Sequence, residues 1–545
     1  MCGILFAIQD AASSDGACNG TDSTFQELFR RLQDANTSRG PDAQETMRIA
    51  VENHTLTFFA SELRLRGDAY IAQPHRDDDG NILCWNGEVA SEENDGSKLF
   101  SLLRTQDTQD GIRDCLGSIE GPPQNPYLLL TSVSVGSHPG YELDELPTEC
   151  VFSIDIGKLS EACRVISAPQ YCSRELPAWL LAFRSARLSA VNRTMPVDPP
   201  LPKGLDDIPE HRMAAVDELI TQLDRSVMLR ELHLLVKPEW RCFLAEGLTL
   251  LCWLSWRTGN HADPSEPIDL LNVAFENPRK ISVQVTGNIG GLPKREKKQK
   301  LREPLDYSTV DVAYDVPDRL TGLQEVEELR RLCPGRVWNF VEVNVPFEES
   351  QGARPIVEAL MFPSRTVMDM IARLLLAIAL YFAARGVGQV QSGPGAVPYQ
   401  YTSRARVLLN GLGSDELLGG YGRFRTAFKN GGWQAIIDEL QLELDRIPTR
   451  NLGRDDRVIS SHGKETRHPF LSLSVVSFLA GLPVHQKLDP RLESGLGEKM
   501  LLRLAAVKLG LVEAGFRKKR AMQFGSHSAR MASGDGDRKG DLLIK

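Results

Sequence analysis

The sequence predicts an α/β fold for the C-terminal part of the chain and a strand-rich α+β unit for the N-terminal part. From about residue 210 onward, apolar runs of strand length alternate with segments of helical spacing, which is the pattern of a parallel sheet covered by helices. The first 100 residues instead contain short β-branched and aromatic runs between turns. Residues 121–205 are punctuated by Pro and Gly, and Pro196–Pro202 is typical of a linker. We therefore expect two units, residues 2–200 and 210–545.

In the N-terminal unit, the elements are predicted from residue type. Val51–Ala60 is rich in β-branched and aromatic residues and is predicted to form a strand. Asn81–Val89 alternates around a turn, and Ile82–Trp85 is the strand before that turn. Asn94–Gly96 is predicted to open the next helix. This unit is thus expected to consist mainly of strands and turns.

In the C-terminal unit, apolar periodicity gives the elements. Ala214–Leu229 has helical spacing. Asp269–Phe275 is mostly apolar and of strand length, as expected of a buried parallel strand, and Trp338–Val345 alternates like a strand. Leu323–Leu332 is predicted to be a charged helix, and Leu374–Phe382 a buried helix.

Length, charge and cysteine usage narrow the class of protein. The 545 residues suggest two to four folding units, and large α/β units favour two. The net charge of −9 argues against nucleic acid as the main partner. Ten scattered cysteines without a C-x-x-C pair fit a reduced cytoplasmic protein better than a disulfide scaffold or a zinc module. We find no signal peptide and no apolar stretch long enough to span a membrane.

Cys2 is a candidate nucleophile, because initiator methionine removal is normally allowed before a small residue. The mature chain would then carry a thiol and a free α-amine on one residue. An α-amine has a pKa near 7.7–8.0, so it can take the thiol proton at neutral pH. Taken by itself, a cysteine at position 2 is also compatible with chance.

Several motifs follow Cys2 in a fixed order. They are Arg39–Asp42 (RGPD), Leu63–Gly67 (LRLRG), Gln73–Pro74, Asn86–Glu88 (NGE) and the acidic Asn94–Gly96. Together they resemble the class II, N-terminal-nucleophile glutamine amidotransferases. The resemblance implies an αββα sandwich that hydrolyses glutamine. It weakens after Glu120–Pro122, which suggests that the second half of this unit is shortened or rebuilt.

The resemblance also implies roles for individual residues. Cys2 would attack the side-chain amide of glutamine, while the Asn86 side chain and the backbone N–H of Gly87 would form the oxyanion hole. Arg66, which we favour over Arg64, would clamp the substrate α-carboxylate. Asp95 would bind the substrate ammonium, and Asn86 and Glu88 complete the glutamine-binding set. The plain alternative for the Asn86–Gly87 pair is a hairpin turn.

The C-terminal unit contains a glycine-rich acidic loop, Gly411–Tyr421 (GLGSDELLGGY), after the apolar strand Ala405–Leu409. Glycines allow a backbone to approach an anion closely, and loops after strands are where α/β sheets bind ligands. Asp415 and Glu416 are predicted to hold Mg²⁺ on the phosphates of ATP. The alternative is a glycine-rich loop that caps a helix.

This loop resembles the signature of asparagine synthetases, which belong to the ATP-pyrophosphatase group. The resemblance implies a doubly wound parallel sheet that activates a carboxylate with ATP and Mg²⁺, with Asp415 as the metal ligand. The residues implied in ATP binding are Leu271, Val273, Gly411, Gly413, Ser414, Asp415 and Glu416.

Four further stretches agree with this family in order: Pro317–Gly322, Thr366–Asp369, His462–Leu471 and Glu498–Arg503. Within the third stretch, Glu465 and Arg467 would shape the floor of the active site or form a buried ion pair and nothing more. Within the fourth, Lys499 would stabilise charge that develops during catalysis, or it would be an exposed helix lysine.

The sequence departs from the family at three places. The expected Ser-Gly-Gly-x-Asp pyrophosphate loop belongs at residues 242–256, where Gly247 is the only glycine and no aspartate occurs. Leu412 stands where asparagine synthetases commonly have a catalytic glutamate. Residues 371–401 look longer than the family's connection, and Gly386–Gln400 is predicted to be a loop.

The resemblance, closest to asparagine synthetase domain-containing proteins, predicts glutamine-dependent asparagine synthesis. Glutamine, aspartate and ATP would be the substrates, with neither nucleic acid nor a membrane as a partner, and the resemblance is compatible with a homodimer. Because the pyrophosphate loop is missing, a glutaminase-only or non-catalytic regulatory descendant is the alternative. A third hypothesis is an adenylating amidotransferase that uses another acid.

Overall fold

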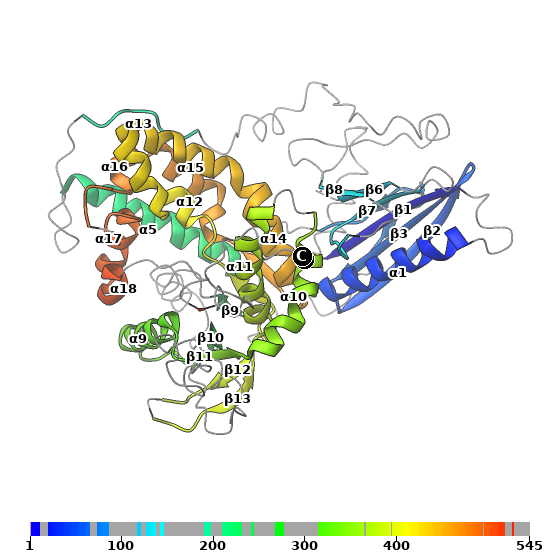
Figure 1. Ribbon diagram of the computed structural model, residues 1–545, viewed down its shortest axis with the longest axis horizontal. Helices are drawn as coiled ribbons and strands as arrows, with labels where there is room; N and C mark the ends of the chain where they lie inside the picture. The colour runs from blue at the N-terminus through cyan, green and yellow to red at the C-terminus, as the bar shows by residue number, and fades with distance from the viewer. Residues whose placement is uncertain are drawn as a thin grey trace, which may run out of the picture.

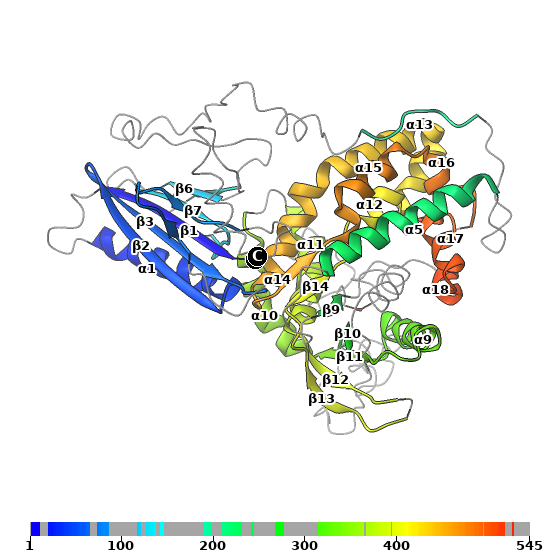
Figure 2. The same ribbon diagram turned by 180° about the vertical axis from the view of Figure 1, so that it is seen from behind.

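The computed structural model describes fifteen ranges of the chain and leaves the rest outside the description that follows. These ranges are 2–10, 20–65, 73–86, 117–120, 127–137, 142–145, 190–197, 210–231, 241–244, 267–276, 314–363, 367–393, 395–493, 495–517 and 526–527. Within them the chain forms two large sheets, one from each part of the sequence (Figures 1 and 2).

The N-terminal sheet has six strands in the order β2-β3-β1-β7-β6-β8. All its neighbouring strands pair antiparallel. Their bounds are β1 Gly3–Asp10, β2 Ala43–Val51, β3 His54–Glu62, β6 Gly117–Glu120, β7 Tyr127–Thr131 and β8 Glu142–Asp144. Two short strands, β4 (His75–Arg76) and β5 (Ile82–Leu83), pair antiparallel as a separate small sheet.

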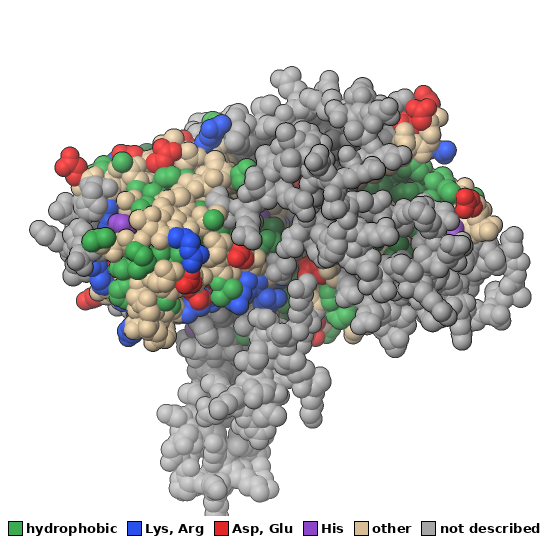
Figure 3. Space-filling view, turned by 90° about the horizontal axis from the view of Figure 1, so that it is seen from above, with side chains coloured by type: hydrophobic (Ala, Val, Ile, Leu, Met, Phe, Trp, Pro, Cys, Tyr) green, Lys and Arg blue, Asp and Glu red, His purple; other side chains and the backbone are tan. Residues whose placement is uncertain are grey.

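Helix α1 (Gly20–Arg39) covers one face of this sheet. Its apolar residues Phe25, Leu28 and Leu32 pack with residues of β1, β3 and β7 that point to the same face. The opposite face is also apolar, with side chains such as Phe6, Leu56 and Phe58, and Figure 3 shows apolar side chains gathered over this sheet. Both faces of this sheet therefore carry apolar side chains.

Two expectations for the N-terminal part need correction. The chain over 20–39 is a helix, although the first 100 residues were expected to be strands and turns. Its apolar residues Phe25, Leu28, Phe29 and Leu32 recur at the i, i+3, i+4, i+7 spacing of an amphipathic helix, so the sequence carried a helical signal that the prediction overlooked. The strand predicted over Val51–Ala60 is two strands, because β2 ends at Val51 and β3 begins at His54 after a tight turn. The helix predicted to open at Asn94–Gly96 lies outside the described residues.

The C-terminal sheet has seven strands in the order β13-β12-β11-β10-β9-β14-β15. Five of them are parallel, and β12 and β13 extend the sheet in antiparallel fashion beyond β11. Their bounds are β9 Arg241–Leu244, β10 Ile268–Phe275, β11 Trp338–Val345, β12 Val387–Val390, β13 Tyr399–Thr402, β14 Val407–Leu409 and β15 Glu465–Arg467. The α/β prediction for this part is confirmed.

Helices cover both faces of the C-terminal sheet (Figure 1). One face packs on α10 (Phe347–Met361), α11 (Val367–Arg385) and α14 (Gly453–Ser460), through a core that includes Val341, Val343 and Leu408. The other face and its helical extension pack on a second core. The elements there are α5 Glu210–Glu231, α9 Pro317–Leu332, α12 Ser414–Leu418, α13 Gly422–Ile447, η5 Pro448–Leu452, η6 Pro469–Leu471, α15 Leu473–Gly481, α16 Val484–Lys487, α17 Met500–Lys508 and α18 Val512–Phe516.

The helices predicted over 214–229, 323–332 and 374–382 are confirmed as parts of α5, α9 and α11, and the strands over 269–275 and 338–345 as β10 and β11. The loop prediction for Gly386–Gln400 is wrong at both ends, because β12 and β13 pair there as a hairpin. Both prolines of this segment come between the two strands in the sequence, whereas Gly388, Gln389 and Gln400 belong to the strands. None of the helices in the described part of the chain has the length and apolarity needed to cross a bilayer.

The two parts of the chain pack directly against each other through α10, α11 and α14, which lie beside the end of the N-terminal sheet in both views (Figures 1 and 2). Ala35 and Val133 pack in the core of α11 and α14, and Phe362 packs in the core under α1. A small cluster of Leu63, Leu65 and Val407 bridges the two sheets. The N-terminal end of β1 thereby lies at the junction between the two parts.

Candidate active sites

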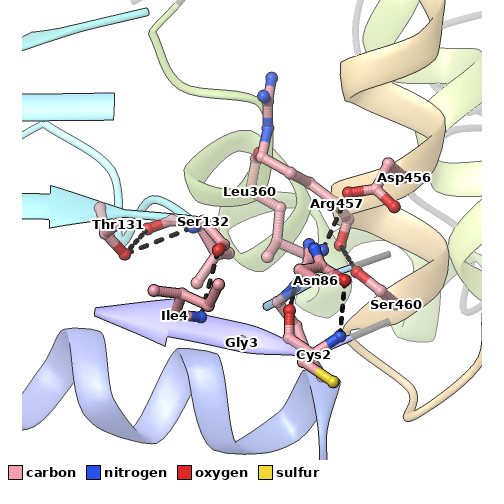
Figure 4. Close-up of polar contacts among 12 residues, drawn as sticks. Cys2, Gly3, Ile4, Asn86, Thr131, Ser132, Leu360, Asp456, Arg457 and Ser460 are labelled. Carbon is pink, nitrogen blue, oxygen red and sulfur yellow. Dashed lines mark hydrogen bonds and ion pairs between the residues drawn. The ribbon is translucent and has the colours of Figure 1, made fainter. Parts of the chain in front are cut away.

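Cys2 lies half-buried at the start of β1, at the junction between the two parts of the chain (Figure 4). Its backbone nitrogen donates a hydrogen bond to Oδ1 of Asn86, at 2.9 Å, although 84 positions separate the two residues. Gly3, which follows, donates to the hydroxyl of Ser61 at 3.1 Å. A Cβ at Gly3 would collide with Asn36 and with Ser61, so only glycine fits behind the nucleophile candidate.

The environment of Cys2 favours the protonated thiol. Burial raises the pKa of the Cys2 thiol, and the nearby carboxylates of Glu62 and Glu465 raise it further. The ammonium at the chain terminus and the backbone of Leu63 act in the opposite direction and do not outweigh burial. A thiol of this kind needs an adjacent base to become a nucleophile at neutral pH.

The predicted Arg39–Asp42 turn directs both of its charged side chains toward the C-terminal part. Arg39 is almost fully buried; its Nη2 pairs with Asp456 on α14 at 3.0 Å, and its Nε donates to the carbonyl oxygen of Cys2 at 3.4 Å. Asp42 pairs with Arg406 and accepts the backbone N–H of Arg64 at 2.7 Å. The sequence marked this turn as a motif but gave no sign that its charges would join the two parts.

The remaining predicted residues of the glutaminase site cannot be placed. Gly87, Glu88, Asp95 and Arg66 lie outside the described residues. Arg64, the alternative to Arg66, is described, and its backbone carbonyl accepts a hydrogen bond from Arg406. The structure therefore brings together Cys2 and Asn86 from this set, and the roles of the other members stay predictions.

The second candidate site lies where β14 ends. The five parallel strands have the spatial order β11-β10-β9-β14-β15, so the strand order reverses between β9 and β14. Open α/β sheets bind ligands outside the carboxyl ends of the strands at such a reversal. The Gly411–Tyr421 loop begins two residues after Leu409, the last residue of β14, and so occupies this position.

At this position, Ser414, Asp415 and Lys499 form a compact cluster. The Lys499 ammonium donates to the Ser414 hydroxyl at 2.9 Å and pairs with Oδ1 of Asp415 at 2.8 Å. Lys499 is buried and adopts a left-handed backbone conformation (φ 54°) immediately before α17. The interpretation of Lys499 as an exposed helix lysine is therefore wrong.

Glycines of the loop create the space for this cluster. A Cβ at Gly420 would overlap the Asp415 carboxylate and the Cε of Lys499. Gly413 has a φ of 100° and would place a Cβ against the side chain of Leu471. Any side chain at either position would displace the ion pair or the backbone beneath it.

The two acidic residues of the loop differ in exposure. Glu416 is buried, and its carboxylate accepts hydrogen bonds from Tyr421 at 2.5 Å and from Asn451 at 2.8 Å. Burial, followed by the charge of Asp415, raises the pKa of Glu416. Asp415 remains about one quarter exposed, with Oδ1 on Lys499. Mg²⁺ in nucleotide sites commonly uses one or two carboxylates together with phosphates and water, which Asp415 can provide and the enclosed Glu416 cannot.

Leu412 fills its position with a buried aliphatic side chain. Its backbone N–H donates to Oδ1 of the fully buried Asn410 at 2.9 Å. Leu271 and Val273 on β10 also bury their side chains in the core against α11. The pairing between β9 and β10 ends at Leu271, so the part of β10 that contains Val273 extends beyond the end of β9. Contact of β10 with a ligand would therefore use its backbone.

The departure from the pyrophosphate loop coincides with the reversal point. Residues 245–256 follow β9 directly and lie outside the described residues. The strand β9 itself is central in the sheet and pairs with β14, the strand before the Gly411–Tyr421 loop. Residues 248–256 contain no glycine.

Two further motif pairs have clear structural contacts. Nε of Arg467 lies 2.6 Å from the Glu465 carboxylate on β15. Burial disfavours ionisation of Glu465, but the terminal ammonium and Arg467 outweigh it and lower the pKa of Glu465 to about 2. In the Pro317–Gly322 turn, Arg319 donates to Asn272 at 2.7 Å and pairs with Glu342 at 2.6 Å, which fastens α9 to the sheet. Sequence reasoning missed these partners of Arg319.

Comparison with known proteins adds an independent line of evidence. The family profile of asparagine synthase matches residues 428–536. The chain is similar to asparagine synthetase domain-containing protein 1 from Homo sapiens, with 31% identity across 97% of this chain and 95% of the relative. The relatives of the same name from Bos taurus and Gallus gallus are each 32% identical, with coverage of 90% and 98% of this chain and 91% and 98% of theirs. The similarity extends across both sheets.

Proposed function

Because the chain belongs to the family of asparagine synthetase domain-containing proteins, we propose that it is a glutamine-dependent ligase that makes asparagine from aspartate. In this proposal residues 2–200 form an N-terminal-nucleophile glutaminase, and residues 210–545 form an ATP-pyrophosphatase-type synthetase. The carrying observation is that one chain combines a Cys2–Asn86 contact with a Ser414–Asp415–Lys499 cluster at the strand reversal.

The first half-reaction would take place at Cys2. After removal of Met1, the α-amine accepts the thiol proton, and the sulfur attacks the side-chain amide carbon of glutamine. Asn86 already accepts the Cys2 nitrogen through Oδ1, so its amide nitrogen is the end available to the oxyanion, together with the N–H of Gly87. Return of the proton releases ammonia and leaves a thioester, which water hydrolyses to glutamate. Arg66, Glu88 and Asp95 would hold the substrate.

The second half-reaction would take place at the Gly411–Tyr421 loop. The aspartate side-chain carboxylate attacks the α-phosphate of ATP, which gives an aspartyl-adenylate and pyrophosphate. Ammonia then displaces AMP and forms the amide of asparagine. Lys499, held by Ser414 and Asp415, would stabilise the negative charge that develops on the phosphate oxygens. Asp415 would hold Mg²⁺, which neutralises phosphate charge.

One specific observation favours a second function. Residues 242–256 lack the glycines and the aspartate of the pyrophosphate loop, and Leu412 replaces the common glutamate. A chain with these changes could retain glutaminase chemistry or a regulatory role alone. The backbone nest that binds phosphate depends on glycines, so the loss acts on ATP binding and leaves the Cys2 site untouched.

The decisive experiment incubates the purified full-length protein with glutamine, aspartate and Mg-ATP, and measures glutamate, asparagine and pyrophosphate separately. We expect all three products, loss of glutamate release in Cys2→Ala, and loss of pyrophosphate but not of glutamate in Lys499→Ala. Glutamate without pyrophosphate from the wild-type protein would establish the glutaminase-only function. If the wild-type protein released neither glutamate nor pyrophosphate, both the synthetase and the glutaminase-only proposals would be refuted.

A further inference from the structure

Helix α14 carries four consecutive charged residues, Arg454–Arg457, in the centre of the molecule. Four adjacent charges on a helix of eight residues cannot all face solvent, and none of these side chains is more than about one quarter exposed. Buried charges require partners. The partners outside α14 include Arg39, Glu145, Leu360 and Asn410, from four parts of the chain, so α14 acts as a junction.

The first contact of α14 leads to the Gly411–Tyr421 loop. Asp455 is fully buried, and its Oδ1 accepts Nε of Arg454 at 2.7 Å. Its Oδ2 accepts the side-chain amide of Asn410 at 3.3 Å. Asn410 in turn accepts the N–H of Leu412. The backbone at the start of the loop is thus held by a buried carboxylate of α14.

The second contact leads to the thiol site. Asp456, the next residue, pairs with Arg39 at 3.0 Å, and Arg39 donates to the carbonyl oxygen of Cys2. Figure 4 shows α14, with Asp456 and Arg457, beside Cys2 and Asn86. Two neighbouring aspartates on one helix turn therefore reach the two candidate sites.

The Arg39–Asp456 pair is incomplete. Nη1 of Arg39 and Oδ1 of Asp456 are buried and have no hydrogen-bond partner among the described residues. Arginine and carboxylate can form two parallel hydrogen bonds, and only one is made here. Rotation of either side chain to form the second bond would move Arg39 relative to the Cys2 carbonyl, which is the kind of change that coupling between the two sites requires.

We propose that Asp456 is a positioning residue of the Cys2 site, supplied by the C-terminal half, and that α14 transmits the state of residues 410–412 to Cys2 through the Asp455–Asp456 pair. This inference rests on the proposed role of Cys2 as the nucleophile. Asp456 acts through Arg39 on the backbone of residue 2 and does not itself contact substrate.

The first test compares Asp456→Asn with Asp438→Asn. The control removes the carboxylate of an exposed ion pair between Arg193 and α13. Glutaminase kcat should fall about 10-fold to 100-fold in Asp456→Asn, as for a misplaced nucleophile, and recover in Asp456→Glu, while Asp438→Asn matches the wild type. The groups that shift the pKa of Cys2 do not include Arg39 or Asp456. The pH midpoint of Cys2 alkylation by iodoacetamide should therefore stay unchanged.

Two results of this test would overturn positioning by Asp456. One is a kcat in Asp456→Asn within twofold of the wild type. The other is an alkylation midpoint that moves together with kcat, which indicates general collapse of the site. Absence of glutamate release from the wild-type protein is a separate result that refutes the proposed function itself.

The second test needs no variant and no turnover. Cys2 of the wild-type protein is alkylated with iodoacetamide, and hydrogen exchange is measured on the peptide that spans residues 405–418. We expect alkylation to change exchange in this peptide at least twofold, and the change to disappear in Asp456→Asn. Equal exchange before and after alkylation of the wild-type protein would show that α14 does not couple the sites.

Discussion

At the scale of single residues, the second candidate site depends on positions where a side chain is missing. Gly420 allows Asp415 and Lys499 to meet, since any Cβ there would occupy their space. Lys499 reaches Ser414 only because its own backbone turns into the left-handed region before α17. The positions of the Asp415 and Lys499 side chains thus depend on the glycine at 420 and on the left-handed backbone at residue 499.

Gly420→Ala should slow pyrophosphate formation strongly while the protein remains folded. The added methyl group forces the Asp415–Lys499 pair apart, and loss of a positioned cation costs roughly 100-fold in rate. Gly422→Ala is the matched control, because nothing lies within 4 Å of a Cβ at that position. Pyrophosphate assays and thermal unfolding of both variants check this. Equal activity in the two variants would contradict the role of the cluster.

At the scale of elements, buried polar groups fasten one helix to the next. Lys487, at the end of α16, is 1% exposed and donates to the carbonyl oxygen of Leu479 on α15 at 3.0 Å. Burial lowers the pKa of Lys487 to about 7. The Lys487 amine therefore gives a hydrogen-bond partner to a carbonyl oxygen at the end of α15, and its removal from water is the unfavourable part of this contact.

Lys487→Met should stabilise the protein at pH 6, by about 2 kcal/mol. In the wild type, the folded state binds the proton only below about pH 7, while the unfolded chain holds it up to about pH 10.4. The unfolded state binds more protons between these values, so wild-type stability rises with pH there. The advantage of the variant should shrink as pH increases from 7 to 10.

Urea unfolding across this pH range measures the effect. Lys508→Met is the control, because Lys508 is about one third exposed and pairs with Asp217 at the surface. A stability difference between wild type and Lys487→Met that does not change with pH would contradict a buried, neutral lysine.

At the scale of the whole molecule, the two parts of the chain are joined by a mixed interface. Leu63, Leu65 and Val407 form its apolar bridge, and the pairs Arg39–Asp456 and Asp42–Arg406 flank it. Cys2 lies at this junction, so docking of the two parts determines its environment. Burial is the main cause of the raised pKa of the Cys2 thiol, and the charge of Glu465 in the C-terminal half adds to it.

Leu65→Asp should uncouple the two parts without unfolding either. Leu65 is 8% exposed, and a carboxylate in this bridge would be buried without a partner. Calorimetry should show two separated transitions in place of overlapping ones, and Cys2 should become alkylated several-fold faster. Leu473→Asp, at a position 57% exposed, serves as the control. An unchanged calorimetric profile for Leu65→Asp would show that the bridge does not hold the parts together.

The sequence by itself determined the elements whose signal is local. The helices α5, α9 and α11 and the strands β10 and β11 follow from apolar periodicity. The family follows from the order of motifs along the sequence, which can be read without a structure. Helix α1 escaped prediction although Phe25, Leu28, Phe29 and Leu32 have helical spacing. The β12–β13 hairpin escaped prediction because the residues between its strands are rich in Gly and Pro, which are typical of loops. The split of residues 51–60 between two strands also escaped prediction.

Only the tertiary structure decided which residues meet. Asn86 lies 84 positions from Cys2, and Asp456 lies 417 positions from Arg39. It also decided that Lys499 is buried on Asp415 and that Glu416 is enclosed by Tyr421 and Asn451. The physical reason is that partner choice for a charge depends on burial and on distance in space, and sequence patterns record neither for residues far apart in the chain.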